Sequence, residues 1–208
     1  TLLWGLALFA LVIGGGLWLI AQSGNGLFWI GLAGLLIGWA YSAPPLKLNS
    51  RGLGEVCVTA GFVLLPIGMD YLARHAFSLT PAAAGLSFGL LVTNLLYINQ
   101  FPDRSADLQA GKHHWVARLP VQQARWGYLL IVALAYGALP LLVVGGILPW
   151  PVLLGWLSLP LSLKATQGLL QHAGQPALLA PAIQQTIGAA SVHGLAVASG
   201  LLAARWLI

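Results

Sequence analysis

The sequence predicts an all-α polytopic membrane protein with about seven transmembrane helices, and three observations support this prediction. Hydrophobic residues make up 59% of the 208 residues and charged residues only 6%, whereas soluble domains are about half apolar and about a quarter charged. The apolar runs are close to the roughly 20 residues that cross a hydrocarbon core as a helix. These runs do not alternate polar with apolar residues, as the strands of a β-barrel would.

We expect seven spans, at Leu2–Ile20, Leu27–Pro44, Val56–Leu72, Ala82–Gln100, Trp126–Val144, Pro151–Leu170 and Ala177–Trp206. Pro44 and Pro45 end the second span, because proline lacks a backbone N–H and restricts the residue before it. Pro102 should break the fourth span in the same way, which would place the following residues on a short separate helix that ends at Gly111. Pro181 makes the start of the last span a loop or a kink.

Basic residues are distributed unevenly between the two predicted sides of the membrane. One side carries seven of the nine, namely Lys47, Arg51, Arg104, Lys112, Arg118, Arg125 and Lys164. By the positive-inside rule, the loops that carry these seven face the cytoplasm. The net charge of +5 is dispersed between apolar spans, so it indicates lipid headgroups or anionic ligands and no nucleic acid. Cys57 is the only cysteine, which excludes an internal disulfide and a cysteine-cluster metal site.

An acidic face follows the fourth span. Asp103 and Asp107 are two of only four acidic residues in the chain, and Asn99 lies four positions before them. On a helix this spacing places three oxygen-bearing side chains on one face. Two carboxylates suit Mg²⁺, which proteins usually hold with one or two carboxylates while substrate phosphates complete the shell. The alternative is a solvated helix whose acidic groups pair with Arg104 and Lys112 at the surface.

Basic side chains are placed to neutralise such phosphates. Lys47 and Arg51 lie in the short loop after the double proline, and Lys112 and Arg118 follow the acidic face. Lysine and arginine bind phosphate groups, arginine through its bidentate fork. The two loops together predict a magnesium–diphosphate site at the membrane surface, and hence a lipid diphosphate substrate. The alternative for Lys47 and Arg51 is a purely topological role, since positive-inside residues need no ligand.

Other polar residues have structural interpretations. Asn94 lies inside the fourth span, where it either lines a cavity or makes an interhelical hydrogen bond. Glu55 begins a helix, where a negative charge suits the helix dipole. His113 and His114 read as interfacial residues and not as metal ligands, because adjacent side chains on a helix point in different directions. Lys164 is expected to extend its ammonium group to the membrane surface.

The two loops carry motifs that resemble those of the UbiA-type membrane prenyltransferases. These motifs are Tyr41-Ser-Ala-Pro-Pro-Leu-Lys-Leu-Asn-Ser-Arg-Gly-Leu-Gly-Glu55 and Asn99-x-x-x-Asp103-x-x-x-Asp107-x-x-x-Gly111-Lys112. The resemblance is greatest to the branch that prenylates 1,4-dihydroxy-2-naphthoate in menaquinone synthesis. It implies nine helices around a central cavity, with two aspartate-rich motifs at the cytoplasmic mouth in the inner membrane of a prokaryote. It also implies that Mg²⁺ bridges these motifs to a polyprenyl diphosphate, which ionises to an allylic cation that an aromatic acceptor attacks.

The resemblance assigns roles residue by residue. Asp103 and Asp107 match the second aspartate-rich motif and would hold the metal, with Asn99 beside them. Lys112 matches the lysine that follows this motif. Tyr41 matches a tyrosine near the diphosphate or the nascent cation, which makes it a catalytic candidate. The basic loop of the family, between its fourth and fifth helices, corresponds to Lys47 and Arg51.

The first aspartate-rich motif of the family has no counterpart in the sequence. We therefore expect residues 1–208 to be a single membrane domain that corresponds to family helices three to nine and is truncated at its N-terminus. This chain alone is then expected to be inactive or nearly so. Three alternatives remain open: a different acceptor such as 4-hydroxybenzoate, a transporter, and a non-catalytic lipid-binding protein.

Overall fold

A computed structural model describes residues 2–207, in which the chain is helical and contains no strand. Within residues 2–207, six helices are long and apolar enough to cross a membrane: α1 (Leu2–Ser23), α2 (Asn25–Ser42), α3 (Gly54–Arg74), α4 (Leu79–Gln109), α6 (Val121–Val144) and α8 (Ala180–Leu207). The shorter elements are η1 (Leu48–Ser50), α5 (Trp115–Arg118), η2 (Trp150–Ser158), α7 (Leu159–His172) and η3 (Pro176–Leu178). The predicted all-α polytopic class is confirmed.

The sixth predicted span consists of two helical segments of different type. Its first part is the 3₁₀-helix η2, and α7 continues directly from it. The change of type follows from Pro160, which lacks the N–H that would donate to the Trp156 carbonyl in an α-helix; the Leu159 N–H donates to that carbonyl instead. The last span begins with η3 and not with α8, and Pro181 lies in the first turn of α8.

Glycine allows η2 to lie against α8. A Cβ atom at Gly200 of α8 would come within 2.3 Å of the Pro151 carbonyl oxygen and 2.8 Å of the Val152 nitrogen. Both of these atoms belong to backbone, so a larger residue at this position would separate the two elements. By contrast, a Cβ at Gly137 of α6 would meet nothing within 4 Å.

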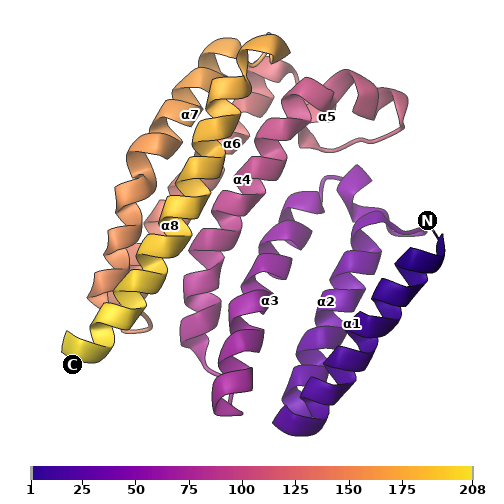
Figure 1. Ribbon diagram of the computed structural model, residues 1–208. Helices are drawn as coiled ribbons and strands as arrows, with labels where there is room; N and C mark the ends of the chain where they lie inside the picture. The colour runs from indigo at the N-terminus through magenta and orange to yellow at the C-terminus, as the bar shows by residue number, and fades with distance from the viewer. Residues whose placement is uncertain (1, 208) are drawn as a thin grey trace.

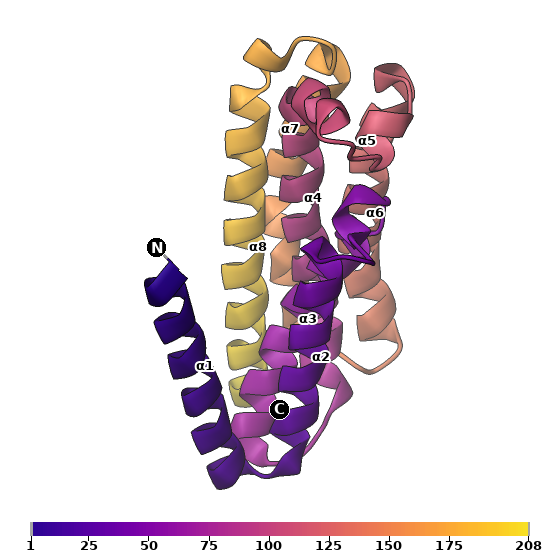
Figure 2. The ribbon, with the colours of Figure 1, turned by 90° about the vertical axis from the view of Figure 1, so that its right-hand side faces the viewer.

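The helices form a bundle with a flanking layer (Figures 1 and 2). Helices α4, α6, α7 and α8 pack around one apolar core, α3 packs along α4, and α2 and α1 follow at the edge of the molecule. The core of the bundle consists mainly of buried aliphatic and aromatic residues from these four helices, together with Leu179 just before α8: Leu91, Tyr97, Ile98, Phe101, Tyr128, Val132, Tyr136, Leu169, Leu179 and Ala182. Many large apolar side chains on the outer faces are exposed, as expected for helices that face lipid.

Helix α4 continues through Pro102, so the predicted break at this residue is wrong. The helix has 31 residues and carries both aspartates on its last two turns. Proline removes one backbone hydrogen bond, but tertiary packing holds the helix on both sides of it. Ile98 and Phe101 are buried before the proline, and the Arg104 guanidinium is hydrogen-bonded to residues 116–119 after it. The predicted end at Gly111 is confirmed, since Gly111 has a φ of 72° just past the helix.

The loops that were predicted to share one side of the membrane do lie at one end of the bundle. The α2–α3 connection, the α4–α6 connection and the α7–α8 connection are together at the upper end in Figure 1. The α1–α2, α3–α4 and α6–η2 connections and the C-terminus are at the opposite end. The chain therefore has a basic end, which carries the predicted site, and an opposite end with Arg74 and Arg205.

Candidate functional site

Direct hydrogen bonds join the two loops that the sequence singled out. The backbone N–H of His113 donates to the Ser50 carbonyl oxygen at 2.8 Å. The indole Nε1 of Trp115 donates to the Gly52 carbonyl oxygen at 2.7 Å. The loop between α2 and α3 and the loop after α4 thus form one surface, at the end of α4 where the aspartates lie.

Asp107 is at the centre of a small polar network. Its two carboxylate oxygens contact Lys112 Nζ at 2.6 Å and His114 Nε2 at 3.0 Å. The chain turns back to make these contacts because the Lys112 N–H donates to the Asp107 carbonyl oxygen and the Gly111 N–H to the Leu108 carbonyl oxygen, which is a Schellman ending. Asp103 lies one turn earlier, is exposed, and makes no side-chain hydrogen bond within residues 2–207.

Lys112 is held in its charged form. Its hydrogen bond to Asp107 is the largest cause that raises the pKa of Lys112, and the charges of Asp107, Tyr41 and Asp103 act in the same direction. Partial burial opposes this shift but is outweighed. Lys112 is therefore a cation at neutral pH, placed within electrostatic range of both aspartates and of the Tyr41 hydroxyl.

His114 has a role that the sequence interpretation missed. The residue is only 2% exposed, so the interfacial placement expected for it is wrong. One ring nitrogen contacts Asp107, and the other accepts a hydrogen bond from the Ala117 N–H and so caps α5. The only hint in the sequence is the position of His114 three residues after Gly111, in a chain that reverses direction there.

Two arginine side chains donate hydrogen bonds to backbone carbonyl groups of the loop between α2 and α3. Arg51 donates to the Pro45 carbonyl oxygen at 2.8 Å, and Arg118 donates to the Arg51 carbonyl oxygen at 3.2 Å. Both side chains are exposed, and each retains further N–H donors for another ligand. Lys47 is exposed and has a left-handed backbone with a φ of 43°. The structure therefore brings the four predicted basic residues to the same end as the aspartates.

Arg104 anchors the second loop to α4. Its Nε donates to the Val116 carbonyl oxygen at 2.9 Å, and one terminal nitrogen lies 3.3 Å and 3.4 Å from the carbonyl oxygens of Ala117 and Leu119. Val116 and Ala117 are buried, so these carbonyl groups depend on protein donors. Arg104 is thus a positioning residue for the loop that carries Lys112 and His114, and not a surface partner of the aspartates.

A second polar cluster lies just below the loops. Gln100 Nε2 of α4 donates to Glu55 Oε1 of α3 at 2.8 Å. Glu55 Oε2 and Gln100 Oε1 are buried and have no hydrogen-bond partner within residues 2–207. Glu55 occupies the first turn of α3 as predicted, but its pairing with Gln100 was not foreseen, because the two residues are 45 positions apart.

The two asparagines named from the sequence make structural hydrogen bonds. Asn94 is fully buried, and its Nδ2 donates to the Tyr128 carbonyl oxygen of α6 at 3.2 Å, which agrees with the interhelical interpretation. Asn94 Oδ1 has no partner among residues 2–207. Asn99 donates to the Leu95 carbonyl oxygen within α4. Their contact with a substrate stays a prediction.

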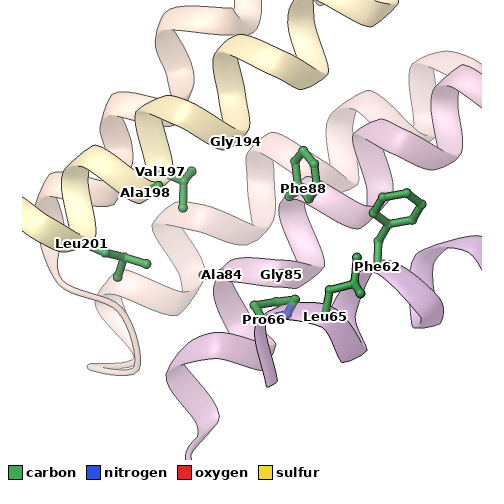
Figure 3. Close-up of a pocket in the computed structure, with 10 residues that line it drawn as sticks. All are labelled: Phe62, Leu65, Pro66, Ala84, Gly85, Phe88, Gly194, Val197, Ala198 and Leu201. Atoms are coloured by element: carbon green, nitrogen blue, oxygen red, sulfur yellow. The ribbon is translucent and has the colours of Figure 1, made fainter. Parts of the chain in front are cut away.

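Apolar cavities lie between the helices below these polar groups. One cavity of about 330 Å³ lies between α3, α4 and α8, and Figure 3 shows Phe62, Phe88 and Leu65 among its lining side chains. A second cavity of about 290 Å³ lies between α2 and α3. Phe62 and Leu65 line both cavities, and Tyr41 is part of the wall of the second. The second cavity therefore approaches the polar end at Tyr41, whereas the first lies nearer the opposite end, beside the start of α4 and the last part of α8.

The donor groups at this end fit a divalent cation only in part. Within residues 2–207 no group of three or more His, Cys, Asp or Glu side chains is placed to hold a metal ion. Asp103 and Asp107 supply carboxylate oxygens from successive turns of α4, and the Asp103 side chain is exposed and makes no hydrogen bond or salt bridge within residues 2–207. Such a pair suits Mg²⁺ that completes its shell with water and phosphate oxygens.

The fold and the site together define a class of polytopic membrane protein. Carboxylate and basic side chains lie together at one end of its bundle, and an apolar cavity approaches them at Tyr41. The profile of the UbiA prenyltransferase family matches residues 1–180. The chain therefore belongs to the UbiA prenyltransferase family.

Individual proteins of this kind are also similar to the chain in sequence. The chain is 29% identical over 160 residues to a 2-carboxy-1,4-naphthoquinone phytyltransferase of Synechocystis, which covers 74% of this chain and 49% of that protein. It is 28% identical over 159 residues to the 1,4-dihydroxy-2-naphthoate octaprenyltransferase of Escherichia coli, covering 74% and 50%. With the enzyme of the same name from Bacillus subtilis it shares 24% over 206 residues, covering 95% and 63%. The chain thus spans about half the length of the first two relatives. No solved structure matches it significantly.

Proposed function

We propose that the protein transfers a polyprenyl group from a polyprenyl diphosphate to an aromatic acceptor, a naphthoate or a close analogue. The main observation behind this proposal is the junction of the Asp103–Asp107 face of α4 with the basic loop between α2 and α3. One relative is named for a 1,4-dihydroxy-2-naphthoate acceptor and another for a 2-carboxy-1,4-naphthoquinone, and these names support the acceptor class. The proposal concerns the activity of the whole protein, since the chain spans about half the length of these relatives.

The diphosphate head would bind at the basic end of the bundle. Asp103 and Asp107 would hold Mg²⁺, which when bound would draw negative charge from the leaving diphosphate. Lys112 would exchange its contact with Asp107 for a phosphate oxygen, and the free donors of Arg51 and Arg118 would bind the outer phosphate. Lys47 adds a further cation at the rim.

The prenyl tail would extend into the apolar interior. The cavities between α2 and α3 and between α3, α4 and α8 are lined almost entirely by apolar groups and exclude charged side chains. Tyr41 stands where the wall of one cavity approaches Lys112, so its ring would face the first isoprene unit when the C–O bond to diphosphate breaks. An aromatic face stabilises a nearby cation. Breaking of this C–O bond leaves diphosphate in the basic site and an allylic cation; a ring carbon of the acceptor then bonds to the allylic carbon and loses its proton to water, which restores the aromatic ring.

The positive-inside distribution supports placing this end in the cytoplasm, and the bacterial relatives support a prokaryotic inner membrane. Both substrates would then reach the site from the cytoplasmic face of the bilayer.

The test is prenyl transfer by membranes that contain the whole protein and not residues 1–208 alone, supplied with a polyprenyl diphosphate, 1,4-dihydroxy-2-naphthoate and Mg²⁺. We expect a prenylated product that Asp103→Asn and Asp107→Asn reduce at least about a hundredfold, since each removes a negative charge that would hold the metal at the diphosphate, and Asp107→Asn also weakens the contacts with Lys112 and His114. Asp70→Asn is the matched control, because Asp70 pairs with Arg74 at the opposite end. Full activity in the Asp103→Asn, Asp107→Asn double variant would refute the proposed site.

A further inference from the structure

A polar cavity faces outward between α7 and α8, away from the site described above. It has a volume of about 310 Å³ and is lined by Lys164, Gln167, Gln171 and His172 of α7 and by Gln185 of α8, among other residues. The two helices approach closely beside it, since a Cβ atom at Gly168 would lie 3.0 Å from the Ala182 Cβ.

This cavity lies on the outer surface of the bundle. Ala165 and Leu169 of α7 are fully buried in the core, whereas Lys164, Gln167 and Gln171 are exposed on the other face of the same helix. Spacings of three, four and seven residues place these three side chains in one row. On a helix that faces lipid, a row of polar groups is costly unless it meets polar partners.

The charge around the cavity is positive. None of the four acidic residues of the chain lines it, and Lys164 makes no salt bridge or side-chain hydrogen bond within residues 2–207. The first turn of α8, which begins at Ala180, borders the cavity, and the start of a long helix favours negative charge. The chemistry of the cavity therefore favours an anion that also accepts hydrogen bonds from amide groups.

The cavity lies at the basic end of the bundle, since His172, the last residue of α7, and Pro181, in the first turn of α8, both line it. Lys164 lies eight residues before His172, the last residue of α7, which is about 12 Å along the helix. The α7–α8 connection is at the same end of the bundle as the Asp103–Asp107 site (Figure 1). A lysine at this depth reaches the phosphate layer of the bilayer.

We propose that this cavity binds the headgroup of an anionic glycerophospholipid. The Lys164 ammonium group contacts the phosphodiester, and the amide groups of Gln171 and Gln185 donate to phosphate oxygens and accept from headgroup hydroxyls. A glycerol headgroup offers hydroxyls to the two glutamine amides and places no cation beside the Lys164 ammonium group. A choline headgroup brings a cation and has no hydroxyl. The site is separate from prenyl transfer, and its occupant is a structural lipid and not a substrate.

The experiment measures lipid binding to the detergent-purified protein by native mass spectrometry, with a phosphatidylglycerol and a phosphatidylcholine of the same acyl chains. We expect preferential binding of phosphatidylglycerol, weakened about fivefold by Lys164→Gln, the effect of one lysine at an anionic surface. Gln185→Leu should weaken it as well, because it removes a neutral donor within the cavity. Arg205→Gln, at the far end of α8, is the matched control and should leave binding unchanged.

Three outcomes would overturn the proposal. Equal binding of the two lipids would exclude recognition of the anionic headgroup. Loss of binding in Lys164→Gln without an effect of Gln185→Leu would indicate general electrostatic attraction and no built site. Displacement of the lipid by millimolar inorganic phosphate would identify a site for free phosphate. The melting temperatures of the lipid-free variants, which we expect to equal that of the unaltered protein, verify that each variant is folded.

Discussion

Replacement of Arg104 by methionine tests whether this residue positions the loop that completes the site. Methionine keeps a long apolar side chain on α4 but removes every donor. The carbonyl oxygen of Val116 loses its 2.9 Å hydrogen bond, and those of Ala117 and Leu119 lose a shared and longer one. Hydrogen bonds from charged donors contribute about 1.5–3 kcal/mol each, so one full and one shared bond correspond to roughly 3 kcal/mol.

The assay is hydrogen exchange of the backbone amides of residues 112–119. A loss of roughly 3 kcal/mol that acts only on this loop would speed exchange there by about a hundredfold, at ~1.4 kcal/mol per factor of ten. The amides of α6 and α8 should keep their protection, because the core of the bundle is untouched. Arg205→Met, an exposed arginine on α8, is the matched control and should change neither region.

Two results would refute this reasoning. Unchanged exchange in residues 112–119 would mean that the guanidinium contacts do not hold the loop. Equal acceleration in the loop and in the transmembrane helices would mean that Arg104 contributes to global stability and does not position the loop.

Further predictions concern packing and the Asp107 network. Gly200→Ala should lower the free energy of unfolding by about 1–3 kcal/mol in thermal unfolding, because the new methyl group meets the backbone of η2. Gly137→Ala should raise it by about 0.5–1 kcal/mol, because the methyl group there has open space and alanine favours the helix. Equal effects of the two substitutions would contradict the packing described. The pKa of Lys112 is raised in the folded state by its hydrogen bond to Asp107. This bond therefore contributes stability that is fully present below the ordinary lysine pKa of about 10.4. The contribution is lost as the pH rises through the higher folded-state pKa. The protection factors of the loop amides, which compare exchange with the intrinsic base-catalysed rate at the same pH, should therefore fall above that pH in the unaltered protein and should not show this fall in Lys112→Met. His114→Ala removes the cap of α5 and a partner of Asp107, and should speed exchange at residues 115–118 about fivefold; no change would exclude a capping role.

The spans could be predicted because the bilayer requires long apolar helices, and the apolar runs are visible in the sequence. The break at Pro102 was predicted from local chemistry alone. It does not occur because Ile98, Phe101 and Arg104 hold α4 by contacts with other helices and with a loop that follows it. The 3₁₀ segment before α7 ends beside Pro160, which is visible in the sequence, but its close approach to Gly200 of α8 depends on a tertiary contact that no local pattern shows.

The site was predictable to the extent that acidic residues are rare in this chain. Asp103 and Asp107 stand out for that reason, and the structure brings the predicted basic loop to them. The pairing of Glu55 with Gln100 depends on the register of α3 against α4, which the sequence does not encode in any short motif. His114 was misassigned because its burial results from a chain reversal three residues after the helix end.

Because α4 is one continuous helix, it fixes the distance between the groups that it carries. Its 31 residues extend about 46 Å, whereas the hydrocarbon core of a bilayer measures about 30 Å. Phe88 on the wall of the apolar cavity and Asp103 at the charged end lie fifteen residues apart on this single rod, which fixes them about 22 Å apart along its axis. A hinge at Pro102 would have left that separation free to vary with every motion of the loop. With one continuous helix, the distance between the charged end and the apolar cavity is set by the number of residues between them, so insertion of one helical turn between Phe88 and Asp103 would lengthen it by about 5.4 Å.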